Sequence, residues 1–218
     1  MKNSTTKLRL PLAKDGIPFI MLGIGVTLML WVLGFAALAY PFALVTVFVL
    51  FFFRDPERTP PPGNRNVLSP ADGKILEVKK IDAGDSPLGE PAVKVSIFMS
   101  IFNVHVNRIP ANGVVEKIEY HQGKFFSANL DKASLENERN TVALRTNDSK
   151  KIVVTQIAGL IARRIVCWVS EGDSVTAGGR FGLIRFGSRL ELLLPLESSV
   201  TVEKGDRARA GVTVIARL

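Results

Sequence analysis

The sequence has little of the chemistry that metal centres and disulfide frameworks need. Its 218 residues include one cysteine, Cys167, and two histidines, His105 and His121. A single cysteine excludes an intramolecular disulfide and a zinc site of several cysteines, and two histidines are too few for a histidine cluster. We therefore expect no metal. Cys167, in an apolar strand-like run, and His121, in a turn-like one, are assigned no role.

Charge of either sign is missing from a long stretch near the N-terminus. The 38 residues from Gly16 to Phe53 contain no Asp, Glu, Lys, Arg or His. The part from Ile17 to Gly34 is long enough to cross a bilayer as a helix, whereas only about 13 residues follow Pro41, which suits one arm of a hairpin. The stretch predicts an apolar helical membrane anchor, either a single span or a shallow hairpin.

Basic residues on both sides of this stretch predict its orientation. Lys2, Lys7, Arg9 and Lys14 precede it and Arg54 follows it. The positive-inside rule then places the N-terminus in the cytoplasm, and a hairpin returns the chain to the same side. A cleaved signal peptide is the alternative, but the apolar run is far longer than a signal core and no clear cleavage site follows. We expect attachment to the cytoplasmic face of the cell membrane.

A proline-rich charged segment divides the chain. Residues 54–63 include four prolines and predict a stiff, extended linker between the membrane-associating residues 1–53 and a domain of residues 64–218. The domain is of a size that suits one globular unit. The net charge is +8, but about half of the excess lies in the N-terminal region and no basic stripe stands out in the domain. We expect no nucleic-acid partner.

The domain is predicted to be mostly β, in an α+β chain. Its short β-branched runs, bounded by Gly, Pro, Asn or Asp, are typical of a sandwich or barrel. Gly172–Gly178 recurs 33 residues later as Gly205–Gly211, and such Gly-Asp turns resemble those of biotinyl- and lipoyl-type barrel-sandwich domains. Residues 130–138 are predicted to form an exposed turn or short helix. The predicted strands are residues 74–78, 93–99, 114–118, 141–144, 151–154 and 165–169.

The most unusual segment is residues 178–189, in which glycines, apolar residues and arginines alternate. Gly187 has no Cβ, so the Gly187-Ser188 pair can adopt a strained backbone in which the serine hydroxyl approaches the preceding carbonyl. That geometry permits an N-to-O acyl shift. By spacing alone, a strand and turn in which Ser188 caps a bend is the stronger interpretation.

Several motifs together change this balance. They are Phe181–Arg189, Phe53–Pro56, Ser69–Lys74, Phe102–Pro110 and Ala162–Ile165. In these motifs, and in their order over nearly its whole length, the chain resembles short-form bacterial phosphatidylserine decarboxylases, which are pyruvoyl enzymes. Long-form relatives carry Leu-Gly-Ser-Thr at the cleavage point and His-x-x-His before a proline. This chain has Phe186-Gly187-Ser188-Arg189 there, and Arg108 where the second histidine would fall, so the base for self-cleavage is open.

The resemblance implies a pyruvoyl-dependent carboxy-lyase that is made as a zymogen. Ser188 would attack the Gly187 carbonyl to form an ester, β-elimination would release the upstream chain, and hydrolysis would leave an N-terminal pyruvoyl group as covalent cofactor. The substrate amine would form a Schiff base with its ketone, which accepts the electrons released with CO2. Phosphatidylserine would thereby become phosphatidylethanolamine, a step of phospholipid biosynthesis.

His105 is the candidate general acid and base, because imidazole titrates near neutrality; the alternative is a strand histidine with satisfied hydrogen bonds. Asp72 is the candidate for orienting that imidazole in a Ser-His-Asp arrangement with Ser188. Its Pro-Ala-Asp-Gly context is also that of an ordinary turn.

Arginines are the candidate substrate ligands, because planar guanidinium groups pair well with phosphate and carboxylate. Arg185 and Arg189 flank the scissile bond and are favoured over Arg163 and Arg164. The implied partners are a phospholipid substrate and the membrane, and the mature protein would be a heterodimer of its two cleavage products, with higher oligomers left open.

A non-enzymatic membrane-anchored adaptor with a lipoyl-like β domain is the alternative function. It would explain the anchor and the Gly-Asp turns, but it gives Gly187-Ser188 no purpose. A lipoyl or biotinyl carrier would also need a modifiable lysine at its hairpin tip, where the two repeats have Ser174 and Arg207.

Overall fold

The computed structural model describes residues 11–126, 136–159, 164–185 and 187–218. The chain divides into two compact units, Met1–Glu57 and Arg58–Leu218. The first holds the apolar stretch and the second holds every candidate site residue, so each unit is described by itself.

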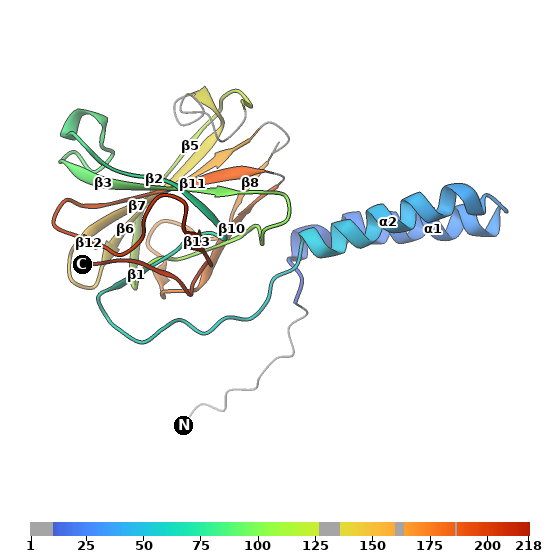
Figure 1. The fold of residues 1–218 in the computed structure, drawn as a ribbon, viewed down its shortest axis with the longest axis horizontal. Helices are drawn as coiled ribbons and strands as arrows, with labels where there is room; N and C mark the ends of the chain where they lie inside the picture. Colours follow the sequence, from blue (N-terminus) through green and yellow to red (C-terminus); the bar gives the residue numbers. More distant parts are fainter. Residues whose placement is uncertain (1–10, 127–135, 160–163, 186) are drawn as a thin grey trace. The chain divides into compact units, whose positions relative to one another are not determined.

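The first unit is a helical hairpin (Figure 1). A single 3-10 turn, η1 (Lys14–Gly16), leads into α1 (Ile17–Val32), and α2 (Ala36–Phe52) returns beside it. Gly34 permits the reversal because its φ of +81° lies in the left-handed region that glycine tolerates best. The segment Lys14–Val32 has 19 residues and a mean hydropathy of 1.8, and it is long and apolar enough to cross a membrane. Of the two arrangements left open by the sequence, the chain forms the hairpin, and its first helix is compatible with membrane association.

The second unit is mostly β, as predicted, with a curled antiparallel sheet of eight strands and two sheets of three strands (Figure 1). A 3-10 turn, η2 (Ala83–Asp85), lies after β2. In spatial order the large sheet is β13 (Arg207–Ala208), β2 (Gly73–Ile81), β3 (Ala92–Met99), β11 (Ser188–Pro195), β7 (Lys151–Ala158), β6 (Arg139–Thr146), β5 (Gly113–His121) and β9 (Ser174–Val175). The small sheets are β1 (Asn66–Leu68), β14 (Val214–Arg217) and β12 (Ser199–Val200), and β4 (Val106–Arg108), β10 (Arg180–Ile184) and β8 (Ile165–Cys167).

The core forms because alternate residues of the strands point to one face of the large sheet. On β11, Leu190, Leu192 and Leu194 are fully buried members of the core cluster, together with residues of the two small sheets. The intervening Arg189 and Glu191 belong to an ion network with polar side chains of β2 and β3. The small sheets thus supply the second layer of a barrel-sandwich-like unit.

The second unit consists of two interleaved halves with the same order of strands. Backbone bonds between the halves are reciprocal: Leu68 N donates to Pro110 O at 2.8 Å, and Arg108 N donates to Pro70 O at 2.9 Å. The sequence Pro-Ala-Asp-Gly at 70–73 returns as Pro-Ala-Asn-Gly at 110–113. The corresponding strands are β1 and β4, β2 and β5, β3 and β6, β11 and β7, β12 and β8, β13 and β9, and β14 and β10.

The duplication explains where Ser188 lies. One half is continuous in sequence, from β4 to β10, whereas the other begins with β1–β3 and resumes at β11. Gly187-Ser188 is where the chain passes from the continuous half back to the interrupted one. Because β11 is hydrogen-bonded along its length to both β3 and β7, a break before Ser188 would leave the strand in place.

Most predicted strands are confirmed within longer ones, but the last is too long: the strand predicted over 165–169 ends at Cys167. The Gly-Asp repeats provide β9 and β13, the two edge strands of the large sheet. Of the segment 130–138, predicted as a turn or short helix, residues 130–135 lie outside the described residues.

Candidate active site

Ser188 opens β11 in the middle of the large sheet. Its Cα neighbours are Met99 on β3 and Ala158 on β7, and its side chain is fully buried. Among the described residues, no hydrogen-bond partner is found for its Oγ. Buried hydroxyl groups are nearly always paired, so an unpaired one calls for an explanation. The preceding Gly187 has a φ of +60°, a left-handed conformation that glycine adopts at little cost.

His105 immediately precedes β4, and this places it at the edge where the chain leaves β10 toward Gly187-Ser188. Val106 is paired with Leu183, two residues before Arg185. The imidazole is fully buried, and its Nδ1 lies 3.0 Å from the Asn103 carbonyl oxygen. Because a carbonyl can only accept, Nδ1 must carry the proton, and the neutral ring then has its lone pair on Nε2. This is the tautomer that a general base requires.

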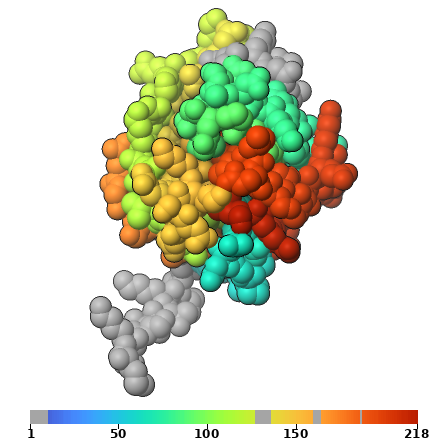
Figure 2. Space-filling model, turned by 90° about the vertical axis from the view of Figure 1, so that its left-hand side faces the viewer, coloured from blue at the N-terminus to red at the C-terminus, as the bar shows by residue number. Residues whose placement is uncertain are grey.

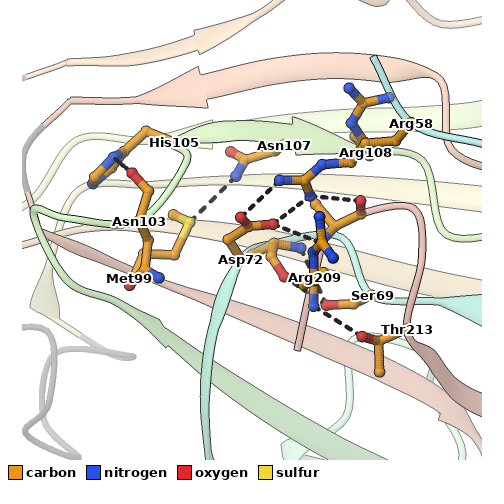
Figure 3. Close-up of polar contacts among 12 residues, drawn as sticks. Arg58, Ser69, Asp72, Met99, Asn103, His105, Asn107, Arg108, Arg209 and Thr213 are labelled. Atoms are coloured by element: carbon orange, nitrogen blue, oxygen red, sulfur yellow. Dashed lines mark hydrogen bonds and ion pairs between the residues drawn. The ribbon is translucent and has the colours of Figure 1, made fainter. Parts of the chain in front are cut away.

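Asp72 is engaged with an arginine and a turn (Figure 3). Arg58 Nη2 donates to Asp72 Oδ2 at 2.7 Å, Arg58 Nη1 makes a second contact with Oδ1, and Ala210 N donates to Oδ1 at 2.7 Å. The Nδ1 of His105 is instead bonded to Asn103. The structure therefore does not join Asp72 to His105, and the predicted Ser-His-Asp arrangement stays a prediction.

The duplication supplies a comparison for Asp72. Its counterpart is Asn112, whose Oδ1 accepts from Ala177 N at 2.8 Å, just as Asp72 Oδ1 accepts from Ala210 N. The amide at 112 shows that fixing this turn needs an acceptor and no charge. What distinguishes Asp72 is its negative charge beside Arg58, whose side chain is only 5% exposed.

Arg108, which stands where long-form relatives have a histidine, is buried. Its Nη1 donates to the Gly178 carbonyl at 2.8 Å, on the strand connection before β10. The guanidinium thus ties β4 to the chain that precedes β10. This hydrogen bond supports the backbone around the candidate site.

The other predicted arginines differ in their surroundings. Arg189 is 1% exposed, and its Nη2 lies 2.9 Å from each of Glu77 Oε1, Ser96 Oγ and Glu191 Oε1. Arg185 is half-buried at the end of β10, and its backbone N donates to the Arg164 carbonyl at 3.3 Å. This contact groups Arg185 with the exposed Arg164, whereas Arg163 lies outside the described residues.

The ion network around Arg189 has an electrostatic consequence for Glu77. Burial by itself would raise the pKa of this carboxyl group, but the opposing attraction of Lys94, its hydrogen bond, and contributions from Lys79 and Ser96 lower the pKa below 4.5 overall. Glu77 therefore stays ionised opposite Lys94, 3.2 Å away.

A chain of buried amides was not foreseen from the sequence. Asn140 Nδ2 donates to Gln156 Oε1 at 2.9 Å, Gln156 Nε2 donates to Asn107 Oδ1 at 2.8 Å, and Asn107 Nδ2 lies 3.6 Å from Met99 Sδ. The chain ends at the cross-strand neighbour of Ser188 and includes a residue two positions after His105. The available signal was a glutamine in the largely apolar strand 152–158, since a buried amide needs partners.

A recess lies at the opposite end of the large sheet, away from Ser188. It is lined by Arg65, Asp148, Lys150 and Leu218. Figure 2 looks onto this end of the unit, where the C-terminal segment (red) lies beside the chain before β1 (cyan) and Leu218 N donates to Arg65 O at 3.0 Å. Among the described residues, no group of three or more His, Cys, Asp and Glu could hold a metal ion.

Comparison with known proteins decides the family. The sequence model of phosphatidylserine decarboxylase matches residues 45–216. The chain belongs to the phosphatidylserine decarboxylase family. It is 51% identical over 201 residues to the phosphatidylserine decarboxylase proenzyme of Syntrophus aciditrophicus, covering 92% of this chain and 94% of that protein. It is 45% identical to the proenzymes of Pelobacter propionicus and Geobacter metallireducens, in each case over 100% of both chains.

The family is one of decarboxylases, which are lyases, and the name proenzyme denotes a precursor that is processed. This membership favours the enzyme over the adaptor that the sequence left as its alternative.

Proposed function

We propose that this chain cleaves itself between Gly187 and Ser188 and, in its processed form, decarboxylates phosphatidylserine to phosphatidylethanolamine. The observation that carries the proposal is the buried Ser188 Oγ, which has no partner among the described residues and directly follows a glycine at φ +60°. Membership of the phosphatidylserine decarboxylase family supports the substrate.

Self-cleavage takes two steps and a hydrolysis. In the first step, Ser188 Oγ bonds to the Gly187 carbonyl carbon as the Gly187–Ser188 C–N bond breaks, which leaves an ester. The hydroxyl proton passes to a base and then to the departing nitrogen. The proposed base is His105, whose Nε2 has the lone pair because Nδ1 donates to Asn103. The left-handed Gly187 bends the backbone ahead of the attacking hydroxyl. In the second step a base takes the Ser188 Cα proton and the Gly187 carboxylate leaves from Cβ, which cuts the chain, and addition of water with loss of ammonia then gives the pyruvoyl group.

The site fits a pyruvoyl group made from residue 188. The group would stand at the first position of β11, buried between β3 and β7, on a strand that both neighbours hold after the chain is cut. There it would supply a ketone that withdraws electrons from the substrate as CO2 leaves. His105 would hold and return the proton at the substrate carbon, and the buried surroundings would exclude water.

For Asp72 to orient the imidazole, its carboxylate would have to exchange Arg58 for His105. Its contacts support a different role for Asp72, in which the carboxylate charge holds Arg58 and a carboxylate oxygen fixes the turn at Ala210. Arg185, next to Arg164 through a backbone hydrogen bond and close to Gly187-Ser188 in sequence, is the proposed ligand for the substrate phosphate or carboxylate. The guanidinium of Arg189 is already engaged by Glu77 and Glu191.

The processed protein would be a heterodimer of residues 1–187 and 188–218, bound to the cytoplasmic face of the membrane through the apolar hairpin. The hairpin supports this location because a phospholipid substrate stays in the bilayer. Pairing of β11 with β3 and β7 supports a stable association of the two fragments.

Intact mass spectrometry of the purified protein tests the proposal. We expect two chains, the shorter with 31 residues and a blocked N-terminus that Edman degradation does not read. Ser188→Ala should give one uncut, inactive chain. Ser198→Ala is the matched control, because Ser198 is also buried, with no Oγ partner among the described residues, but lies beyond the far end of β11. An uncut wild-type chain, or a readable serine at the first cycle, would contradict the proposal.

A further inference from the structure

A short turn beside the site presents two apolar residues at its tip. Asn103 N donates to Ser100 O at 3.0 Å, and the Asn103 Oδ1 accepts from both Ser100 N, at 2.9 Å, and Ser100 Oγ, at 2.8 Å. These three bonds fix the turn. Its central residues are Ile101, which is half-buried, and Phe102, which is 64% exposed.

Apolar residues are unusual at such positions, where Gly, Asn, Asp, Ser and Pro dominate for conformational reasons. The duplicated fold makes the contrast direct. The turn after β6, the counterpart of β3, consists of Asn147, Asp148 and Ser149 and is polar throughout. The end of the sheet that carries the site therefore has apolar residues where the other end has ordinary turn residues.

The turn is joined to the site on both sides. It begins one residue after Met99, the cross-strand neighbour of Ser188, and its last carbonyl, that of Asn103, holds the His105 ring. Three residues of chain reach at most about 11 Å, so Phe102 lies within that distance of Met99. Anything that contacts Phe102 is close to the reacting centre.

Basic residues lie at the same edge of the fold. Arg185 follows β10 directly, next to the exposed Arg164, and the strand register places this end of β10 beside the start of β4 and of β8. An exposed aromatic side chain with arginines nearby is the combination with which proteins bind the interface of an anionic bilayer.

We propose that the turn formed by residues 100–103 contacts the membrane, with Phe102 inserted among the lipid headgroups and Arg164 and Arg185 facing anionic phosphates. The contact would set the buried site against the surface from which a phospholipid enters. It rests on the proposed function for the identity of the membrane lipid, but it assigns membrane binding to the β unit itself, in addition to the helical hairpin.

The kinetic test uses the full chain and two substrates: phosphatidylserine in vesicles and a monomeric short-chain phosphatidylserine. We expect Phe102→Ser to lower kcat/KM on vesicles by about tenfold, because an inserted phenyl group is lost, and to change turnover of the monomeric substrate less than twofold. Phe102→Leu should keep most of the vesicle activity. Leu196→Ser is the matched control, since Leu196 is 43% exposed in the turn after the far end of β11.

A second test does not depend on turnover. In a Cys167→Ser background, Phe102→Cys and Leu196→Cys variants of the full chain each carry one environment-sensitive fluorophore. On addition of vesicles of phosphatidylserine and phosphatidylcholine, we expect a blue shift for the label at 102 and none for the label at 196. The shift would support the contact even if the wild-type chain decarboxylated neither substrate, a result that would overturn only the proposed function.

Three results would overturn the inference. One is an unshifted label at 102, and another is an equal loss of activity of Phe102→Ser on both substrates, which would place the residue in the chemistry. The third is a Phe102→Ser variant whose oligomeric state changes in sedimentation without vesicles, which would show that the turn binds a second copy of the chain.

Discussion

At the scale of single residues, comparison of the two halves of the β unit separates two roles of Asp72. One role is that of a hydrogen-bond acceptor, and the other is that of a negative charge. Asn112 shows that an amide is enough to bind the backbone N of the following turn. Only the negative charge is particular to Asp72, and it faces a nearly buried guanidinium. A carboxylate in this position stabilises Arg58 whatever else it does for the chemistry.

Asp72→Asn is therefore expected to destabilise the β unit, by up to about 3–5 kcal/mol, because it leaves the Arg58 charge without its partner. Denaturant unfolding in the uncut Ser188→Ala background measures this. Asn112→Asp, the matched change in the other half, leaves Arg58 paired and should leave the rate of self-cleavage unchanged.

The rate of self-cleavage shows whether the charge also acts on His105. Arg58→Met removes the other member of the pair, so it disrupts the same contact while keeping the carboxylate. If Asp72→Asn and Arg58→Met slow cleavage equally, Asp72 acts through Arg58. A much larger effect of Asp72→Asn would support the predicted Ser-His-Asp arrangement.

His105 is expected to serve both reactions. His105→Ala should slow self-cleavage and also decarboxylation by any processed fraction, each by about 10² to 10⁴, since a positioned acid or base contributes that much. Val104→Ala is the control for a cavity next to the same strand, as Val104 is also buried. Normal cleavage by His105→Ala would show that another group is the base.

At the scale of elements, β11 has two different faces. Leu190, Leu192 and Leu194 pack into the core, while Arg189 and Glu191 face the ion network that also holds Glu77. This alternation holds Arg189, which follows the proposed cleavage serine, in contacts with Glu77, Ser96 and Glu191. The network therefore anchors the first residues of the strand at which the new N-terminus would form.

The network predicts a defined dependence of stability on pH. The pKa of Glu77 is lower in the folded protein than its usual 4.5, so the group stabilises the fold fully above about pH 4.5 and loses that contribution as the pH falls through the folded value. In the uncut Ser188→Ala background, Glu77→Gln should lower the free energy of unfolding at pH 7, and the difference should shrink toward pH 3. Glu90→Gln, at an exposed position, is the control; a difference that stays constant with pH would contradict the prediction.

At the scale of the whole molecule, the hairpin and the β unit are separate in the fold. All candidate catalytic residues lie in Arg58–Leu218, and the apolar helices lie in Met1–Glu57. We therefore expect that the membrane anchor can be deleted without loss of the catalytic residues, and that catalytic residues can be replaced without loss of the anchor.

Deletion of residues 1–53 is therefore expected to leave a domain that still cleaves itself and turns over monomeric short-chain phosphatidylserine. Its activity on vesicles should fall at least tenfold, because loss of an apolar anchor lowers the concentration of enzyme at the surface. The full chain and the truncated Ser188→Ala variant are the controls for activity and cleavage. Full activity of the truncated chain on vesicles would show that the hairpin is dispensable.

The sequence by itself determined the features that depend on local composition. An uncharged run of apolar residues can only avoid water in a core or a bilayer, and β-branched runs between Gly, Pro and Asn residues favour short strands. The predicted helix is confirmed in α1 and the predicted strands in the large sheet, whereas Gly187-Ser188 as the cleavage site stays a prediction from the motifs.

Tertiary structure alone decided which distant groups meet. Asp72 pairs with Arg58 and Arg189 with Glu77 because strands and loops far apart in sequence are neighbours in the fold, and their spacing along the chain carries no sign of it. The position of Ser188 between the two interleaved halves has the same origin: pairing of β11 with both β3 and β7 is set by packing of the whole sheet. Local sequence determines which segments form helices and strands, whereas long-range hydrogen bonds and buried contacts determine which of these elements become neighbours.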